Sequence, residues 1–170
     1  GDGGHWQFIP VSFAPFAYGA ALSWAMDANR DLPLAKALDA HVFLDAAGMM
    51  GQAALDLGNA HLKTNVTVGN STVYYALLCR NLTGATGKGP LKNMTIDGID
   101  AAGKAIDDAL ARMAKARMAR PDASTVLAEF GTDAALAKIA LTIGRERISC
   151  GNVGTSDLPE AGRKAIAEDL

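Results

Sequence analysis

The chain has 170 residues, of which 49% are hydrophobic and 20% are charged, and its formal net charge is −2. This length is sufficient for one well-buried domain, and the high apolar fraction predicts that part of the surface packs against a body outside the chain. The charge balance argues against a nucleic-acid-binding protein, which needs a basic patch. The apolar stretch from Phe13 to Met26 is too short to cross a membrane, so no membrane partner is expected.

In chain order, apolar residues recur at helical spacing, and no strand-like alternation bounded by hairpin turns is present. The first predicted helix begins near Ala14 or Pro15 and is apolar nearly all round, which predicts burial on several sides. Asp31 and Asp45 are predicted to cap the next two helices, and Thr95 is predicted to open a long amphipathic one. The expected helices cover approximately residues 14–29, 33–42, 46–61, 71–79, 95–118, 126–148 and 159–170.

This pattern predicts an all-α fold, an irregular bundle of about six helices preceded by a glycine-rich loop. Gly48 and Gly51 are expected inside the third helix, where they make sense if another backbone approaches closely. Cys79 and Cys150 are expected to be two buried thiols rather than a disulfide. The last helix is still running at the final residue, so the expectation is that the helical domain is incomplete at both ends.

Candidate catalytic groups are sparse along the sequence. His41 and Asp45 are four residues apart, but Asp45 is better explained as a helix cap, so neither a metal ion nor a cofactor is expected. Ser23 lacks the surroundings of a nucleophile and is expected to bond back to the preceding helical turn. The adjacent acids Asp107–Asp108 and Glu168–Asp169 are expected on solvated helix faces. No complete catalytic set is therefore predicted in this chain.

The opening stretch GDGGHWQ combines flexible glycines with an acid, an imidazole and an indole. Trp6 can stack on a sugar or another ring, while Asp2 and His5 can hydrogen-bond hydroxyl groups. The alternative is that Trp6 only fastens the loop to the first helix, and the residues themselves favour neither interpretation. Asp2, His5 and Trp6 are therefore the candidate substrate-binding residues.

Two stretches carry a family resemblance. GDGGHWQFIPVSFAPFAYGAALSW resembles the end of the catalytic barrel in bacterial family 20-type glycoside hydrolases, the β-N-acetylhexosaminidases. LAKALDAHVFLDAAGMMGQAALDLGNAHLKT resembles the helical continuation, with a His-x-Phe-x-Asp-x-x-Gly core and an Asp-Leu-Gly-Asn end. The stretch ending RERISCGN and the final LPEAGRKAIAEDL are similar more loosely. The first 60 residues are the specific part, and the remainder is generic helix.

The resemblance implies that residues 1–13 end a (β/α)8-barrel whose remainder lies upstream, and that residues 14–170 form a C-terminal helical domain. It implies substrate-assisted hydrolysis of terminal N-acetylhexosamine, with an Asp-Glu pair as the catalytic acid group. That dipeptide does not occur in this sequence, so the chain is not expected to be active by itself. Asp2, His5 and Trp6 would then contact the carbohydrate. The helices would buttress the barrel or mediate assembly, of which a homo-oligomer is one form.

Two other hypotheses stay open at this point. One is a self-standing helical binding or assembly module without chemistry, and the other is part of a different helical carbohydrate-active enzyme, such as an α/α-barrel hydrolase or lyase. The sequence upstream of Gly1 discriminates among the three. The expected protein is soluble, and the sequence does not distinguish the cytoplasm from the periplasm.

Overall fold

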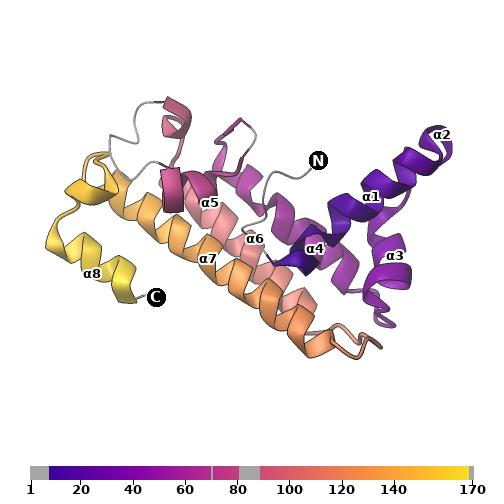
Figure 1. The fold of residues 1–170 in the computed structure, drawn as a ribbon. Coiled ribbons are helices and arrows are strands. Elements are labelled where there is room, and N and C mark those ends of the chain that lie inside the picture. The colour runs from indigo at the N-terminus through magenta and orange to yellow at the C-terminus, as the bar shows by residue number, and fades with distance from the viewer. Residues whose placement is uncertain (1–7, 70, 81–88, 169–170) are drawn as a thin grey trace. The chain divides into compact units, whose positions relative to one another are not determined.

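The computed structural model describes residues 8–69, 71–80 and 89–168, and this part of the chain is all-α, as predicted (Figure 1). No strand occurs within these ranges, although Asp45 and Met118 form an isolated antiparallel bridge. With η marking short 3-10 and π helices, the elements are η1 (Ile9–Ser12), α1 (Phe13–Trp24), α2 (Met26–Asn29), α3 (Leu34–Leu38), η2 (Asp39–Phe43), α4 (Met50–Asn59), η3 (Ala60–Thr64), α5 (Val73–Tyr75), η4 (Ala76–Arg80), η5 (Gly89–Leu91), α6 (Ile96–Met113), α7 (Ala123–Ser149), η6 (Thr155–Asp157) and α8 (Glu160–Glu168).

The chain divides into two compact units, and each is built from two stretches of sequence. Unit 1 combines Gly1–Gly58 with Asp107–Ala134, and unit 2 combines Asn59–Ile106 with Ala135–Leu170. The long helices α6 and α7 are therefore divided between the units. Unit 2 contains the first part of α6 and the second part of α7, and unit 1 contains the rest of both helices. The predicted boundary after residue 13 stays a prediction, because residues 1–7 lie outside the described part.

Unit 1 has a core to which distant parts of the sequence contribute. Its fully or nearly fully buried side chains come from α3, η2, α4 and the first half of α7, and they include Leu38, Phe43, Met50, Leu57, Val126 and Phe130. The helical spacing of Val126 and Phe130 places both on one face of α7. This core is where the second half of the unit, residues 107–134, meets the first.

Helix α1 differs from its prediction. It carries no charged residue, yet none of its residues is buried, so the expected burial on several sides is wrong within this chain. The helix also breaks at Ala25 (φ −154°, ψ 88°) and resumes as α2, where the sequence predicts one continuous helix to Asn29. The Tyr18 hydroxyl donates to the Arg30 carbonyl (2.9 Å) across the break. In Figure 1, α1 leads from η1 outward to α2.

Several predicted helix starts can be compared directly with the structure. Asp31 does not cap α3, which begins after Pro33 without a side-chain cap and continues into the wider turns of η2. Asp45 does bind amides at the start of α4, but this helix begins at Met50 rather than at residue 46. The Thr95 hydroxyl accepts a bond from the Gly98 amide (3.1 Å) at the start of α6, as predicted. Helix α6 ends at Met113, earlier than expected.

In unit 2, the first part of α6 and the second part of α7 run antiparallel to each other. Asp100 pairs with Arg145, and one helical turn further along, a side chain at Gly103 would meet Leu141. The Asp100–Arg145 ion pair joins α6 to α7 near their antiparallel crossing. The buried face of α7 in this unit is formed by small and aliphatic residues: Ala137, Ile139, Ala140, Leu141 and Ile143.

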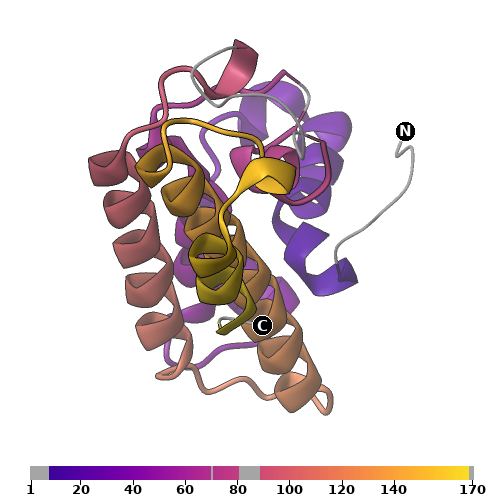
Figure 2. The same cartoon turned by 90° about the vertical axis from the view of Figure 1, so that its left-hand side faces the viewer.

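The end of α7 is closed by a turn around a buried arginine. Gly151 (φ 85°) and Asn152 (φ 64°) adopt left-handed backbone there, and the Asn152 amide donates to the Arg147 carbonyl (2.8 Å). The Arg147 side chain is completely buried, its Nε donates to the Val153 carbonyl (3.0 Å), and burial lowers the pKa of its guanidinium. Helix α8 follows beside α7, where Gly162 lies close to the Glu146 carboxylate (Figure 2).

Both cysteines are free, but their predicted burial is wrong. Cys79 is exposed and Cys150 is half-buried. Cys79 lies on the π helix η4, where the wider turn shifts the faces that a regular helix would present.

Candidate functional site

The residues predicted to bind substrate, Asp2, His5 and Trp6, lie outside the described part of the chain. The description begins at Phe8, two residues after Trp6. The described residues that follow directly in the chain lead into the exposed apolar helix α1. A loop later in the sequence, around Phe43 and Asp45, anchors this helix. Each belongs to unit 1.

The segment from Phe8 to Met26, here called the Phe8–Met26 surface, exposes large apolar side chains. Trp24 is 90% exposed and Phe16 is 51% exposed, and Phe8, Ile9 and Met26 are exposed as well. No charged residue occurs from Phe8 to Met26. Large exposed apolar side chains gathered in one short uncharged segment are typical of an interaction surface on a folded protein.

Exposure alternates around α1 with the helical period. The half-buried face carries Phe13, Ala14, Ala17, Tyr18, Ala21 and Leu22, and the outward face carries Pro15, Phe16, Gly19, Ala20, Ser23 and Trp24. On the outward face, small residues lie between two large aromatic ones. The Ser23 hydroxyl, the polar group of this face, donates to the Gly19 carbonyl (2.8 Å), the back-bond that the sequence predicts.

The start of α1 is fixed to the unit by Phe13. Its ring lies 6.3 Å from the ring of Phe43, which is completely buried and packs edge-on against Phe130 at 6.0 Å. The guanidinium of Arg120 lies over the Phe13 ring, 5.4 Å from its centre. Phe13 therefore connects the exposed helix to the core through aromatic and cation–π contacts.

The guanidinium of Arg120 is held over the Phe13 ring by hydrogen bonds to two other groups. Its Nη1 donates to the Val42 carbonyl (2.6 Å), and its Nε and Nη2 form a two-pronged pair with the Asp122 carboxylate (2.8 and 2.7 Å). The hydrogen bond to Asp122 raises the pKa of Arg120. The sequence did not indicate this role of Arg120, because its contacts with Val42 and Phe13 join residues far apart in the chain.

Asp45 organises the loop that carries the buried Phe43. One carboxylate oxygen accepts from the amides of Ala47 (3.0 Å) and Arg117 (2.6 Å), and the other from Met49 (2.8 Å) and Met50 (2.9 Å). Burial by itself would raise the pKa of Asp45, but the four amide donors outweigh it and lower the pKa. Both oxygens are thus committed to backbone, which makes Asp45 a structural residue rather than a general acid.

Asp39 and two glycines complete this loop. The Gly51 amide donates to Asp39 (2.6 Å), and a Cβ at Gly51 would lie 2.1 Å from the Ala35 carbonyl oxygen, so α3 and α4 require glycine here. This confirms the predicted close approach at Gly51. Gly48 instead lies before the helix with φ +64°, a conformation that favours glycine. Burial raises the pKa of Asp39, with the nearby Asp45 adding to the rise.

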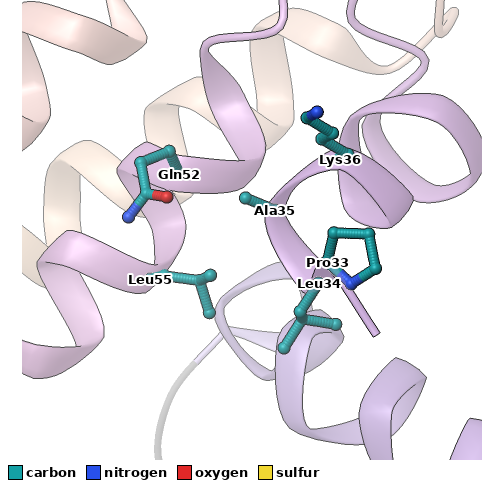
Figure 3. Close-up of a pocket in the computed structure, with 6 residues that line it drawn as sticks. All are labelled: Pro33, Leu34, Ala35, Lys36, Gln52 and Leu55. Carbon is teal, nitrogen blue, oxygen red and sulfur yellow. The ribbon is translucent and has the colours of Figure 1, made fainter. Parts of the chain in front are cut away.

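A shallow cleft of about 350 Å³ lies between the start of α3 and α4 (Figure 3). Leu34 and Leu55 form its apolar wall, and Lys36 and Gln52 are at its rim. The Gln52 amide is already bonded to Asp56 (2.7 Å). The cleft therefore lacks the convergent polar groups that orient a ligand.

The remaining candidate groups do not assemble into a site in the described ranges. His41 and the pair Asp107–Asp108 are exposed, and Asp169 lies outside the described residues. No group of three or more His, Cys, Asp or Glu residues that could hold a metal ion occurs among residues 8–69, 71–80 and 89–168. In the same ranges, no helix combines the length and apolarity needed to cross a membrane.

Comparisons with known proteins identify no relative of this chain. Neither a protein family nor a curated protein matches the sequence, and no solved structure matches the fold.

Proposed function

We propose that this chain is the helical segment of a glycoside hydrolase that acts on terminal N-acetylhexosamine residues. In this proposal the catalytic barrel of the same protein supplies the Asp-Glu acid pair, and the helices buttress it. The loop before Phe8 contributes to the sugar site, with Trp6 packing on the sugar ring and Asp2 and His5 contacting its hydroxyl groups.

The observation that supports this proposal most is the structural role of the residues that carry the resemblance. In the His-x-Phe-x-Asp-x-x-Gly core, Phe43 is the buried ring beneath α1, Asp45 accepts four amides, and Gly48 adopts left-handed backbone. The fold thus uses a buried ring at the Phe position, a hydrogen-bond acceptor at the Asp position and left-handed backbone at the Gly position of the motif. A helical unit of this kind, placed directly after a Gly-Asp-Gly-Gly-His-Trp loop, is what the resemblance implies.

The proposal assigns a limited chemical role to this chain. Substrate-assisted hydrolysis uses the 2-acetamido oxygen of the sugar as the nucleophile, so the protein has to orient that amide and protonate the leaving group. Trp6 would hold the ring, which orients the reacting atoms, and it would not exchange protons. Its loss should therefore weaken substrate binding and positioning without removing the acid group.

The first test is the coding sequence upstream of Gly1 and the activity of the complete gene product. We expect strand–helix units with an Asp-Glu pair, and hydrolysis of 4-nitrophenyl N-acetyl-β-D-glucosaminide by the complete protein but not by residues 1–170. A start codon close to Gly1, or a complete protein that does not cleave this substrate, contradicts the proposal.

The second test separates a sugar contact from a packing role for Trp6. In the complete protein, Trp6→Ala should lower kcat/KM about 10-fold or more with little change in the melting temperature, because an exposed stacking contact adds little to folding. Trp6→Phe keeps an apolar ring and should recover part of the loss. Equal loss of activity and stability in Trp6→Ala would indicate that the indole only packs the loop.

A non-catalytic assembly module is the second candidate, and the Phe8–Met26 surface is the observation that favours it. An uncharged exposed helix with aromatic side chains is also typical of the central part of a protein–protein contact. A start codon close to Gly1, together with a defined oligomer in solution, would support this candidate over the hydrolase.

A further inference from the structure

The stretch from Phe13 to Ala37 contains no buried residue, although the residues on either side of it are buried. Ser12 is 4% exposed before the stretch, and Leu38 is completely buried after it. Helices α1 and α2 therefore lie on unit 1 without contributing to its core. We propose that residues 13–33 form a hinged flap, latched by Phe13, that opens and closes while the rest of unit 1 stays folded. This inference is independent of the proposed function, because it concerns only contacts within unit 1.

Phe13 forms the aromatic contacts that opening of the flap has to break. Its ring lies 6.3 Å from the ring of Phe43 and 5.4 Å from the guanidinium of Arg120. Neither group depends on the flap for its position, since Arg120 is bonded to Asp122 and the Phe43 ring packs against Phe130. The site that receives the Phe13 ring is therefore kept in place when the flap is open, so the flap can close on it again.

Two hydrogen bonds join α1 and α2 into one unit across the break at Ala25. The Asn29 side-chain amide donates to the Ala21 carbonyl (2.8 Å), and the Tyr18 hydroxyl donates to the Arg30 carbonyl (2.9 Å). Both bonds lie within the flap, so opening does not have to break them. We therefore expect the two helices to open together rather than one after the other.

The chain can bend at both ends of the flap. Between α2 and α3, Asp31, Leu32 and Pro33 lie outside the helices, and α3 begins after Pro33 without a side-chain cap. At the other end, Phe13 directly follows the short helix η1, which ends at the buried Ser12. A segment with few buried apolar contacts has a low free energy of local opening. Opening of the flap should therefore cost less free energy than unfolding of unit 1.

Hydrogen exchange of the 170-residue chain, followed by mass spectrometry with and without urea below the unfolding transition, tests this inference. Three variants accompany the parent. Phe13→Ala removes the latch, and Trp24→Ala removes an aromatic side chain of the same helix that is 90% exposed. Val126→Ala weakens the core of unit 1 on α7, at a side chain that is 1% exposed and lies outside the flap.

In the parent, the amides of residues 14–29 should exchange faster than those of α4 and depend less on urea, because opening exposes less surface than unfolding. Val126→Ala should accelerate exchange in α4 about 10-fold or more but change residues 14–29 by less than about 3-fold, since the open state keeps the contacts of Val126. Phe13→Ala should accelerate residues 14–29 about 10-fold or more. Trp24→Ala should change them by less than about 3-fold.

Three results would overturn the inference. If Val126→Ala accelerates residues 14–29 as strongly as α4, the segment opens only when unit 1 unfolds. If Trp24→Ala has as large an effect as Phe13→Ala, or Phe13→Ala has none, Phe13 is not the latch. The third result comes from the parent alone and holds even if Phe13→Ala does not fold: an equally steep urea dependence for residues 14–29 and α4 contradicts a separate opening.

Discussion

Two neighbouring parts of unit 1 use their residues in opposite ways. The Asp39–Gly51 segment contains two carboxylates and two glycines, yet it is anchored by the buried ring of Phe43 and by amide groups that donate to Asp45 and Asp39. The Phe8–Met26 surface is uncharged and apolar, yet its largest side chain, Trp24, is 90% exposed. Apolar composition alone therefore does not show whether a segment is buried. Burial depends on whether other parts of the fold pack against that segment.

Phe43 and Phe16 represent the two parts, because one ring is completely buried and the other is half exposed. Phe43→Ala removes a completely buried ring between Phe13 and Phe130 and should lower the free energy of unfolding by about 3–5 kcal/mol. Phe16→Ala removes a ring that is half in water and should change it by less than about 1 kcal/mol. Urea unfolding of residues 1–170 measures both. Similar losses for the two variants would show that α1 is packed within this chain.

The next largest effect is expected at Asp45. Asp45→Ala leaves four amide groups without their acceptor and should cost about 3 kcal/mol of unfolding free energy, since each unsatisfied buried donor costs about 1–3 kcal/mol and water relieves part of it. Asp27→Ala is the control, because its carboxylate is exposed and lies 3.5 Å from Arg30, an exposed pair that contributes little. An Asp45→Ala variant as stable as Asp27→Ala would mean that the loop does not depend on this carboxylate.

The pH dependence of the free energy of unfolding should differ between variants of the two carboxylates, Asp45 and Asp39. The folded pKa of Asp45 lies below its unfolded value of about 3.9, so its stabilisation is present above that value and is lost as the pH falls through the folded pKa. The folded pKa of Asp39 is raised, so its carboxylate destabilises the fold at neutral pH and this effect disappears on acidification. Asp45→Asn should flatten the acid side of the stability curve below about pH 4. Asp39→Asn should steepen it, and identical curves for both variants would contradict these assignments.

A smaller effect is expected at the crossing of α3 and α4. Gly51→Ala places a methyl group 2.1 Å from the Ala35 carbonyl oxygen, so the helices must shift, at a cost of about 2 kcal/mol. Gly58→Ala, on the same helix with open space around it, should be neutral or stabilise by up to about 1 kcal/mol. The difference in the midpoint of thermal unfolding measures this contrast, and equal midpoints would show that the crossing is looser than 2.1 Å implies.

The smallest expected effect is at Arg120. Arg120→Lys keeps the charge over the Phe13 ring but loses the two-pronged pair with Asp122 and should cost about 1 kcal/mol. Arg112→Lys, which changes a half-exposed pair with Asp56 at 3.5 Å, should cost less. Thermal unfolding of both variants ranks them, and a larger loss for Arg112→Lys would reverse the assigned importance of the two arginines.

Local sequence signals predicted the parts of the fold that local physics decides. The Thr95 hydroxyl at the start of α6, the amides bound by Asp45 and the close approach at Gly51 all follow from capping and glycine chemistry. The all-helical class follows from periodicity. These features depend on residues a few positions apart, which is the range over which a pattern carries information.

Features that depend on distant contacts were not predicted. The break at Ala25 and the buried Arg147 have no local signal, because an alanine favours helix and an arginine favours solvent. The outward exposure of Trp24 follows from the absence of a neighbour within the described chain rather than from its own chemistry. For the candidate site, Asp2, His5 and Trp6 stay predictions.

The Phe8–Met26 surface is expected to be an interface rather than part of the core. Sedimentation of residues 1–170 at micromolar concentration, with fluorescence of a bound hydrophobic dye, tests it directly. We predict association and dye binding, both reduced when Phe16 and Trp24 are changed to serine while the helical circular dichroism stays the same. A monomer that does not bind the dye would contradict the claim.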